Sequence, residues 1–180
     1  MQDILRKHHV LKDSIVTILN KQIKMEAQAS AAYLAMAAWC DVRGYDNSAE
    51  FFFKQSDGER AHMMKLFQYL TDMECQAISP ALEDSQHDFQ DLRSIFEKAL
   101  EMEISVTDSI HEIVKLCREE IDMATEEFMR WFVMEQIEEE YVARRCVELF
   151  DVLGEDKIAL GMFEERVLGV EYKPATGEPA

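Results

Sequence analysis

Apolar side chains recur every three or four residues from Leu11 to Arg43, and this stretch contains neither glycine nor proline. Such a rhythm predicts one long amphipathic helix that ends before Gly44. Because the 180 residues include only 6 glycines and 3 prolines, turn signals are few and the elements must be long. The length fits one domain with a continuous core, so we expect a single all-α domain.

The same rhythm returns in three further long stretches and one short one. The predicted helices span approximately residues 11–43, 47–74, 91–119, 123–153 and 156–168. The second opens with Asn47-Ser48-Ala49-Glu50, which has the residue types of a capping box. Asp122 stands where the fourth helix needs an N-cap.

The connections between these stretches predict how the helices are arranged. The first turn is short, so the first two helices should be antiparallel. Residues 75–90 contain Ser79-Pro80 and lose the rhythm, which predicts a loop of about sixteen residues. We therefore expect a four-helix bundle with one long crossover and a short fifth C-terminal helix over residues 11–168. Residues 1–10 are predicted to be an N-terminal extension, and residues 169–180 a flexible tail.

The charge of the chain limits its partners. Thirty-six acidic residues against 19 basic ones give a formal charge of −17. Nucleic acids and anionic membrane surfaces would be repelled by this charge, so neither is an expected partner, whereas cations would be attracted. The charge could also serve solubility alone.

The four cysteines are dispersed, without a CxxC pair, so the sequence does not encode a zinc knuckle or a rubredoxin-type iron centre. The N-terminal segment lacks the apolar run of a signal peptide, and no stretch approaches the ~20 apolar residues of a membrane span. We expect a protein of the reducing cytoplasm.

An acidic residue interrupts the inward-facing apolar stripe of each long helix near its middle. These residues are Glu26, Glu59, Glu103 and Glu139. Since antiparallel packing brings the helix midpoints to one height, the four carboxylates should meet as a layer inside the bundle. Buried carboxylates cannot all stay ionised without countercharge, so protonation or a bound cation must relieve their repulsion.

Two further side chains accompany the acids at helical spacing. His62 follows Glu59 by three residues, and Gln136 precedes Glu139 by three. Four carboxylates match the charge of two divalent ions, and oxygen donors with one imidazole suit iron or manganese better than zinc. Taken singly, each acid would more often be a solvated surface residue; their coincidence at one depth favours the metal.

Other side chains near the stripe have open interpretations. Tyr33 lies seven residues after Glu26 on the same face, and its hydroxyl could serve the acid layer or simply be satisfied in the core. The remaining histidines are expected on the surface, and both tryptophans are expected to pack beside the stripe. These residues are His8, His9, His87, His111, Trp39 and Trp131.

Over residues 11–168 the chain resembles the bacterial non-haem ferritins. The resemblance is carried by five segments: 38–40 (AWC), 59–63 (ERAHM), 66–72 (LFQYLTD), 131–136 (WFVMEQ) and 138–140 (EEE). It implies a ferritin-like bundle that oxidises Fe(II) to Fe(III) with dioxygen or hydrogen peroxide at a di-iron ferroxidase centre. It also implies storage of ferric oxyhydroxide inside a homo-oligomeric shell of twenty-four subunits.

The resemblance also implies roles for individual residues. Glu26, Glu59 and His62 correspond to the ligands of the first iron, with Glu59 bridging to the second. The second iron corresponds to Glu103, Gln136 and Glu139, and Tyr33 to the family's tyrosine beside the centre.

A third iron site of these ferritins corresponds to Glu135 and Glu138, with Glu139 shared. The acid expected just before Glu59 is Gly58 here, which weakens that site. No haem is expected, because the fourth helix lacks the second ExxH element of bacterioferritins.

Two other functions remain open on the sequence. The chain could be a structural or partner-binding helical module whose stripe acids are protonated or solvated. It could also be a di-iron oxidase that acts on an organic substrate and remains a small oligomer.

Overall fold

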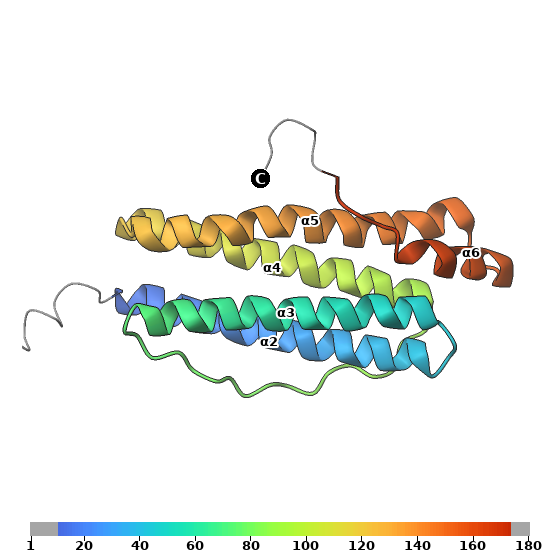
Figure 1. The fold of residues 1–180 in the computed structure, drawn as a ribbon, viewed down its shortest axis with the longest axis horizontal. Helices are drawn as coiled ribbons and strands as arrows, with labels where there is room; N and C mark the ends of the chain where they lie inside the picture. Colours follow the sequence, from blue (N-terminus) through green and yellow to red (C-terminus); the bar gives the residue numbers. More distant parts are fainter. Residues whose placement is uncertain (1–10, 174–180) are drawn as a thin grey trace, which may run out of the picture.

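The computed structural model describes residues 11–173, and within that range all regular structure is helical. The helices are α2 (Asp13–Asp41), α3 (Asp46–Asp72), α4 (Leu92–Glu120), α5 (Met123–Leu153) and α6 (Lys157–Val167). Four long helices lie side by side, and α6 folds back at one end (Figure 1). The predicted ferritin-like four-helix bundle with a short fifth helix is confirmed. The predicted extension 1–10, with His8 and His9, and the last seven tail residues lie outside the described range.

The long connection between α3 and α4 runs along the length of the bundle (Figure 1). Two side chains of α2 hold it there through backbone atoms. Asn20 donates to the Gln76 carbonyl at 3.2 Å and accepts from the Ile78 N–H at 2.8 Å. Gln28 donates to the Glu83 carbonyl at 3.1 Å and accepts from its N–H at 2.8 Å. The crossover is thus irregular but hydrogen-bonded to α2, and it returns the chain to the end where α2 terminates.

Helices α4, α5 and α6 each begin after a residue whose side chain accepts hydrogen bonds from free backbone N–H groups. The Asp122 side chain accepts from the Thr125 N–H, as predicted, and Asp156 caps α6 in the same manner. Asp91 and Ser94 form a reciprocal capping box at the start of α4. Gly44 takes a left-handed φ of 77° in the turn after α2, a conformation that glycine adopts without steric cost.

The predicted capping box at residues 47–50 is wrong. Helix α3 begins at Asp46, with Tyr45 as an N-cap residue whose side chain makes no cap hydrogen bond. Glu164 of α6 supplies the acceptor instead, since its carboxylate lies 2.9 Å from the Asn47 N–H and 3.3 Å from the Ser48 N–H. Glu50 is exposed and pairs with Lys54 on the same helix. A tertiary contact therefore replaces the local cap.

The apolar core is divided into two clusters, one on each side of the acid layer. One cluster includes Phe52, Phe96 and Phe150 near α6, and the other includes Leu66 and Ile110 toward the opposite end. On each long helix the buried residue of the layer, Glu26, Glu59, Glu103 or Gln136, falls between these two sets in the sequence. Burying aromatic and aliphatic side chains above and below fixes the height at which the polar layer sits.

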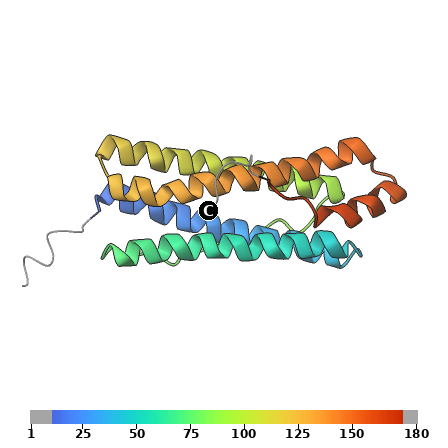
Figure 2. The same ribbon diagram turned by 45° about the horizontal axis from the view of Figure 1, so that its top comes forward.

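Helix α6 closes one end of the bundle (Figure 2). Phe163 stacks on Phe150 with ring centroids 4.1 Å apart and meets the edge of Phe96 at 5.0 Å. Val167, one turn later, is completely buried. After α6 the chain turns back along α5, where Tyr172 contacts Tyr141 with their rings 5.3 Å apart. None of the helices among the described residues has the length and apolarity needed to cross a membrane.

Candidate metal centre

Carboxylates from three helices lie buried at the middle of the bundle. Glu26 of α2, Glu59 of α3 and Glu103 of α4 expose 0%, 1% and 1% of their surface. Glu139 of α5 is partly buried beside them. The helical phase of the sequence predicted this layer, and the structure brings all four residues to the interior.

His62 connects two compact groups of potential ligand atoms. In the first group, atoms of Glu26, Glu59 and His62 all lie within 4.8 Å of one another. In the second, atoms of His62, Glu135 and Glu139 meet the same limit. The imidazole Nδ1 is 3.3 Å from Glu59 Oε2, and Nε2 is 3.9 Å from Glu135 Oε1. One histidine thus faces both acidic sets.

Glu103 and Gln136 complete the layer from α4 and α5, outside both compact groups. The Tyr33 hydroxyl donates to Glu103 Oε1, while Thr107 donates to Gln136 Oε1 at 3.3 Å. Glu139 Oε2 accepts from the Gln55 amide at 2.7 Å. Each of these side chains is therefore held by a neighbouring donor before any ion binds.

Burial raises the pKa of all four carboxyl groups. Desolvation is the largest cause for Glu26 and Glu59, and their negative neighbours raise the pKa values further. Burial and the charge of Glu139 raise the pKa of Glu103 to about 8, although the bond from Tyr33 opposes this shift. Desolvation likewise raises the pKa of Glu139. A set of ionised carboxylates here requires a positive ion among them.

Two carboxylate oxygens in this layer have no hydrogen-bond partner among the described residues. They are Glu26 Oε2 and Glu103 Oε2, and both are fully buried. Unpaired buried oxygens of this kind cost free energy unless something satisfies them. Hard oxygen donors with one imidazole are the ligands that divalent iron accepts, so the residues present fit this metal. The tyrosine beside them stays protonated, because burial and then Glu103 raise the pKa of Tyr33.

The residues proposed for a third ion are only partly assembled. Glu135 and Glu139 lie in the compact group with His62, whereas Glu138 is exposed and does not join it. At Gly58 a Cβ atom would meet nothing within 4 Å, so space for a larger side chain exists there.

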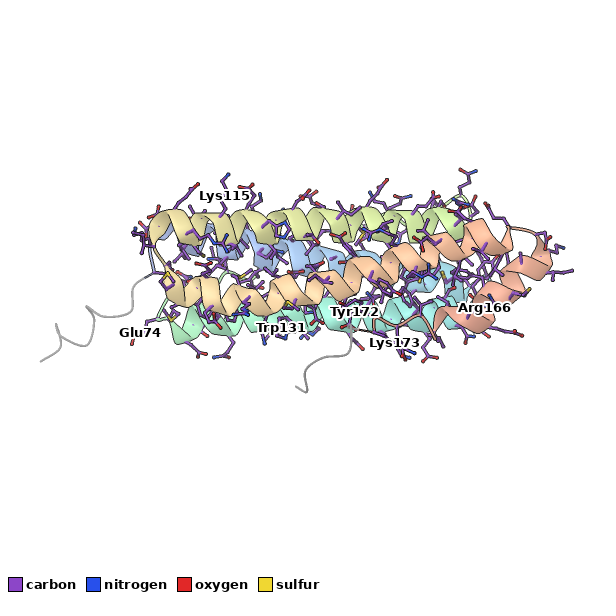
Figure 3. The ribbon with its side chains drawn as sticks, turned by 90° about the horizontal axis from the view of Figure 1, so that it is seen from above. Glu74, Lys115, Trp131, Arg166, Tyr172 and Lys173 are labelled. Carbon is purple, nitrogen blue, oxygen red and sulfur yellow. The ribbon has the colours of Figure 1, made fainter. Side chains whose placement is uncertain are left out.

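A hollow of about 190 Å³ opens beside the centre on the side of α3 and α5. Gln55 and Glu139 of the layer line it, together with Glu138 and the C-terminal residues Val170 and Glu171. Figure 3 looks onto this side of the molecule, where α5 lies beside α3 and the chain after α6 runs past Tyr172. Glu139 therefore belongs both to the acid layer and to the wall of this hollow.

Three positioning side chains were not predicted from the sequence. Gln22 donates to Glu26 Oε1 at 2.8 Å, Ser109 donates to Gln22 at 2.6 Å, and Thr107 holds Gln136. The spacing of four residues between Gln22 and Glu26 is the one signal that could have indicated the first contact.

The surface assignments are confirmed for His87 and His111, which are both exposed. Trp39 is buried, as a packing residue should be. Trp131 remains partly exposed under Lys65 and meets the edge of the His62 ring at 5.5 Å, so it also packs against the centre.

Comparison with known proteins points to one family. The pattern of the Ferritin-like domain family matches residues 16–151. The chain is 34% identical over 156 residues to a probable bacterial non-heme ferritin-like protein of Haemophilus influenzae, covering 87% of this chain and 94% of that protein. It is 32% identical over 158 residues to a bacterial non-heme ferritin of Staphylococcus aureus, covering 88% and 95%.

A solved structure agrees with these sequence relatives. The open pore ferritin of the hyperthermophilic archaeon Archaeoglobus fulgidus superposes with a TM-score of 0.85 and 32% identity, over 87% of this chain and 96% of that one. The resemblance inferred from the sequence motifs is thereby confirmed.

Proposed function

The chain belongs to the ferritin family, and on that premise we propose that it oxidises ferrous ions at the buried carboxylate layer and stores them as ferric oxyhydroxide. Iron is the substrate and the cargo. The observation that carries the proposal is the pair of compact ligand groups sharing His62, beside two unpartnered buried carboxylate oxygens. With all four carboxyl groups ionised and no ion bound, these oxygens would have no partner among the described residues.

Two ferrous ions would bind in this layer, and the charges balance if all four glutamates are ionised. Glu26, Glu59 and His62 would hold the first ion, while Glu103, Gln136 and Glu139 would hold the second. Glu59 would bridge the two, since its carboxyl lies close enough to Glu103 for that charge, after burial, to raise the pKa of Glu59.

In the oxidation, each ferrous ion would lose one electron. The two electrons, with two protons, convert dioxygen to hydrogen peroxide or hydrogen peroxide to water. The residues position the ions, and the metal supplies the redox chemistry. The Tyr33 hydroxyl, bonded to Glu103, would keep one oxygen of that carboxylate in place while the other faces the ion.

The hollow lined by Gln55, Glu138 and Glu139 would connect the centre to the α3/α5 side. Ferric product would leave through it toward a cavity enclosed by further copies of the chain, in a homo-oligomer of twenty-four subunits. A third ion held by Glu135, Glu138 and Glu139 would bind weakly, because Gly58 supplies no carboxylate.

We further propose that the protein is cytoplasmic and binds no haem. Its four cysteines are free thiols, which fits a reducing compartment.

Anaerobic titration with ferrous ions tests this proposal. We expect saturation near two ions per chain, loss of binding in Glu59→Ala, and no change in Glu50→Ala, which alters an exposed residue of the same helix. Binding that never rises above the Glu59→Ala background would overturn the proposal in favour of a structural helical module.

Light scattering distinguishes storage from oxidation of an organic substrate. A hollow shell requires a particle close to twenty-four chains. A stable particle of only a few chains that still oxidises iron would argue against storage and for a small di-iron oxidase.

A further inference from the structure

We infer that Gln22 and Ser109 form a positioning pair that fixes which oxygen of Glu26 faces the metal. The inference rests on the proposed iron-binding function, and it assigns a role to two residues outside the ligand set. It starts from Gln22, which is completely buried on α2 although its amide is polar. A buried amide is retained only where its hydrogen bonds are made.

Both ends of the Gln22 amide are engaged by a single neighbour each. Its Nε2 donates to Glu26 Oε1 at 2.8 Å, one helical turn further along α2. Its Oε1 accepts from the Ser109 hydroxyl on α4 at 2.6 Å. The three side chains therefore form one directed chain of hydrogen bonds, from Ser109 through Gln22 to Glu26.

Ser109 holds the Gln22 amide in place. If the amide were rotated by half a turn, its oxygen would face the ionised carboxylate of Glu26 and repel it, so Glu26, which only accepts, favours the orientation with the NH₂ group toward it. The Ser109 hydroxyl donates to the amide oxygen on the other side, which would otherwise be buried without a donor. The hydroxyl on α4 thus fixes the position of the donor on α2.

The hydrogen bond from Gln22 determines which oxygen of Glu26 remains unpaired. With Oε1 engaged by Gln22, Oε2 is buried and has no partner among the described residues. This oxygen belongs to a residue whose carboxylate lies within 4.8 Å of Glu59 and His62 atoms. Donors that orient metal ligands typically change metal affinity about 10- to 100-fold when removed.

A different role is possible for the same contacts, because Ser109 also joins α4 to α2. If this hydrogen bond served only to join the two helices, its loss would lower the free energy of unfolding and leave the metal coordination unchanged. Cobalt(II) separates the two roles, since its visible absorption spectrum reports the geometry and number of its ligands while its affinity is measured by titration.

We would compare the wild-type chain with Gln22→Leu, Ser109→Ala, the double variant and Ser109→Thr, using Ser105→Ala as the control. Ser105 is exposed on the same helix, one turn earlier. We expect Gln22→Leu to weaken cobalt binding about tenfold or more and to alter its spectrum. Ser109→Ala should do the same at the low end of that range, and Ser109→Thr, which keeps a hydroxyl, should restore the wild-type values.

The double variant tests whether Ser109 acts through Gln22. Removing the hydroxyl should have no further effect on cobalt affinity once Gln22 is leucine, so the two losses should not add. Additive losses, or an unchanged spectrum with a lowered unfolding temperature, would overturn the inference. Should Gln22→Leu fail to fold, Ser109→Ala and Ser109→Thr still decide the question, because Ser109 is only half-buried.

The outcomes also separate this inference from the proposed function. A wild-type chain that binds neither cobalt nor ferrous ions contradicts the proposed function itself. A wild-type chain that binds two ions, with Ser109→Ala indistinguishable from Ser105→Ala, contradicts only the positioning role.

Discussion

Tyr33 of α2 donates its hydroxyl to Glu103 of α4, 70 residues later in the chain, and this contact joins the two halves of the bundle at the height of the acid layer. The ring is fully buried and stacks on Phe52 with centroids 5.9 Å apart. Removing only the hydroxyl should therefore preserve the packing.

For Tyr33→Phe we expect iron oxidation to slow about tenfold, because Glu103 loses the donor that orients it. Stability should fall by about 1–3 kcal/mol, because a buried oxygen of Glu103 loses its donor. Initial oxidation rates, followed by absorbance, and urea unfolding measure the two effects. Tyr141→Phe, at an exposed position, is the control. Equal rates for both variants would show that the hydroxyl serves the core alone.

The raised pKa of Glu103 predicts how the metal-free protein responds to pH. Burial and the charge of Glu139 raise its folded pKa to about 8, whereas a glutamate in the unfolded chain has a pKa near 4.5. Between these values the folded state binds more protons, so this residue's contribution to stability is present below the lower value and is lost as pH rises to about 8.

Urea unfolding at pH 5.5 and 8.5 would measure this effect after removal of metal ions. Glu103→Gln should reduce the loss of stability between these two pH values by on the order of 2 kcal/mol. Glu101→Gln, an exposed neighbour on α4, should not. A Glu103→Gln chain that loses as much stability as the wild type over this range would contradict the assignment.

The capping contact of Glu164 predicts a loss of stability far from the metal centre. Glu164→Ala should cost about 1–2 kcal/mol, since the first N–H groups of α3 lose their acceptor. Glu165→Ala, at the next and exposed position of α6, should change stability by less than about 0.5 kcal/mol. Urea unfolding midpoints distinguish the two, and equal midpoints would mean that α3 needs no cap from α6.

The sequence predicted what depends on helical periodicity. Glu26, Glu59 and Glu103 each fall on the inward face of their own helix, so their meeting required only that the helices pack antiparallel. The cap from Glu164 to Asn47 joins residues 117 positions apart, and local residue types favoured Asn47–Glu50 instead. A contact between distant helices leaves no trace in the spacing of either one.

Gln22 shows the same limit within the site. Its spacing of four residues to Glu26 could be read from the sequence, but that spacing does not show which residue binds the other end of the amide. That partner, Ser109, lies on α4 and became evident only when the helices were placed. The candidate ligands and Tyr33 were named from the sequence, whereas Gln22 and Ser109 were not.

The cysteines should differ sharply in their reactivity toward thiol reagents. Burial raises the pKa of Cys40 and Cys146 to about 12 and that of Cys117 to about 11, so almost no thiolate forms at pH 8. Cys75 is only partly buried, in the crossover. Alkylation of the native protein at pH 8 should modify Cys75 alone, and unfolding in urea should release all four, as mass spectrometry of the peptides would reveal. Rapid native labelling of Cys40 or Cys146 would contradict the burial of these thiols.

Gly58 provides the sharpest test of the auxiliary metal site. It lies inside α3, directly before Glu59, and a Cβ atom there would meet nothing within 4 Å. Gly58→Ala should therefore stabilise the protein by about 0.5–1 kcal/mol, because glycine weakens a helix interior. It adds no ligand, so it should leave metal stoichiometry unchanged.

Gly58→Glu adds the carboxylate that the resemblance to bacterial non-haem ferritins led us to expect just before Glu59. The Cβ atom of the new side chain would meet nothing within 4 Å, so its attachment to α3 causes no clash. We expect cobalt(II) titration to rise from near two ions per chain in the wild type and in Gly58→Ala to near three in Gly58→Glu. Equal cobalt binding by Gly58→Glu and Gly58→Ala would contradict this prediction. It would mean that the exposed Glu138 does not turn toward an ion, and that a factor other than the carboxylate at position 58 limits the third site.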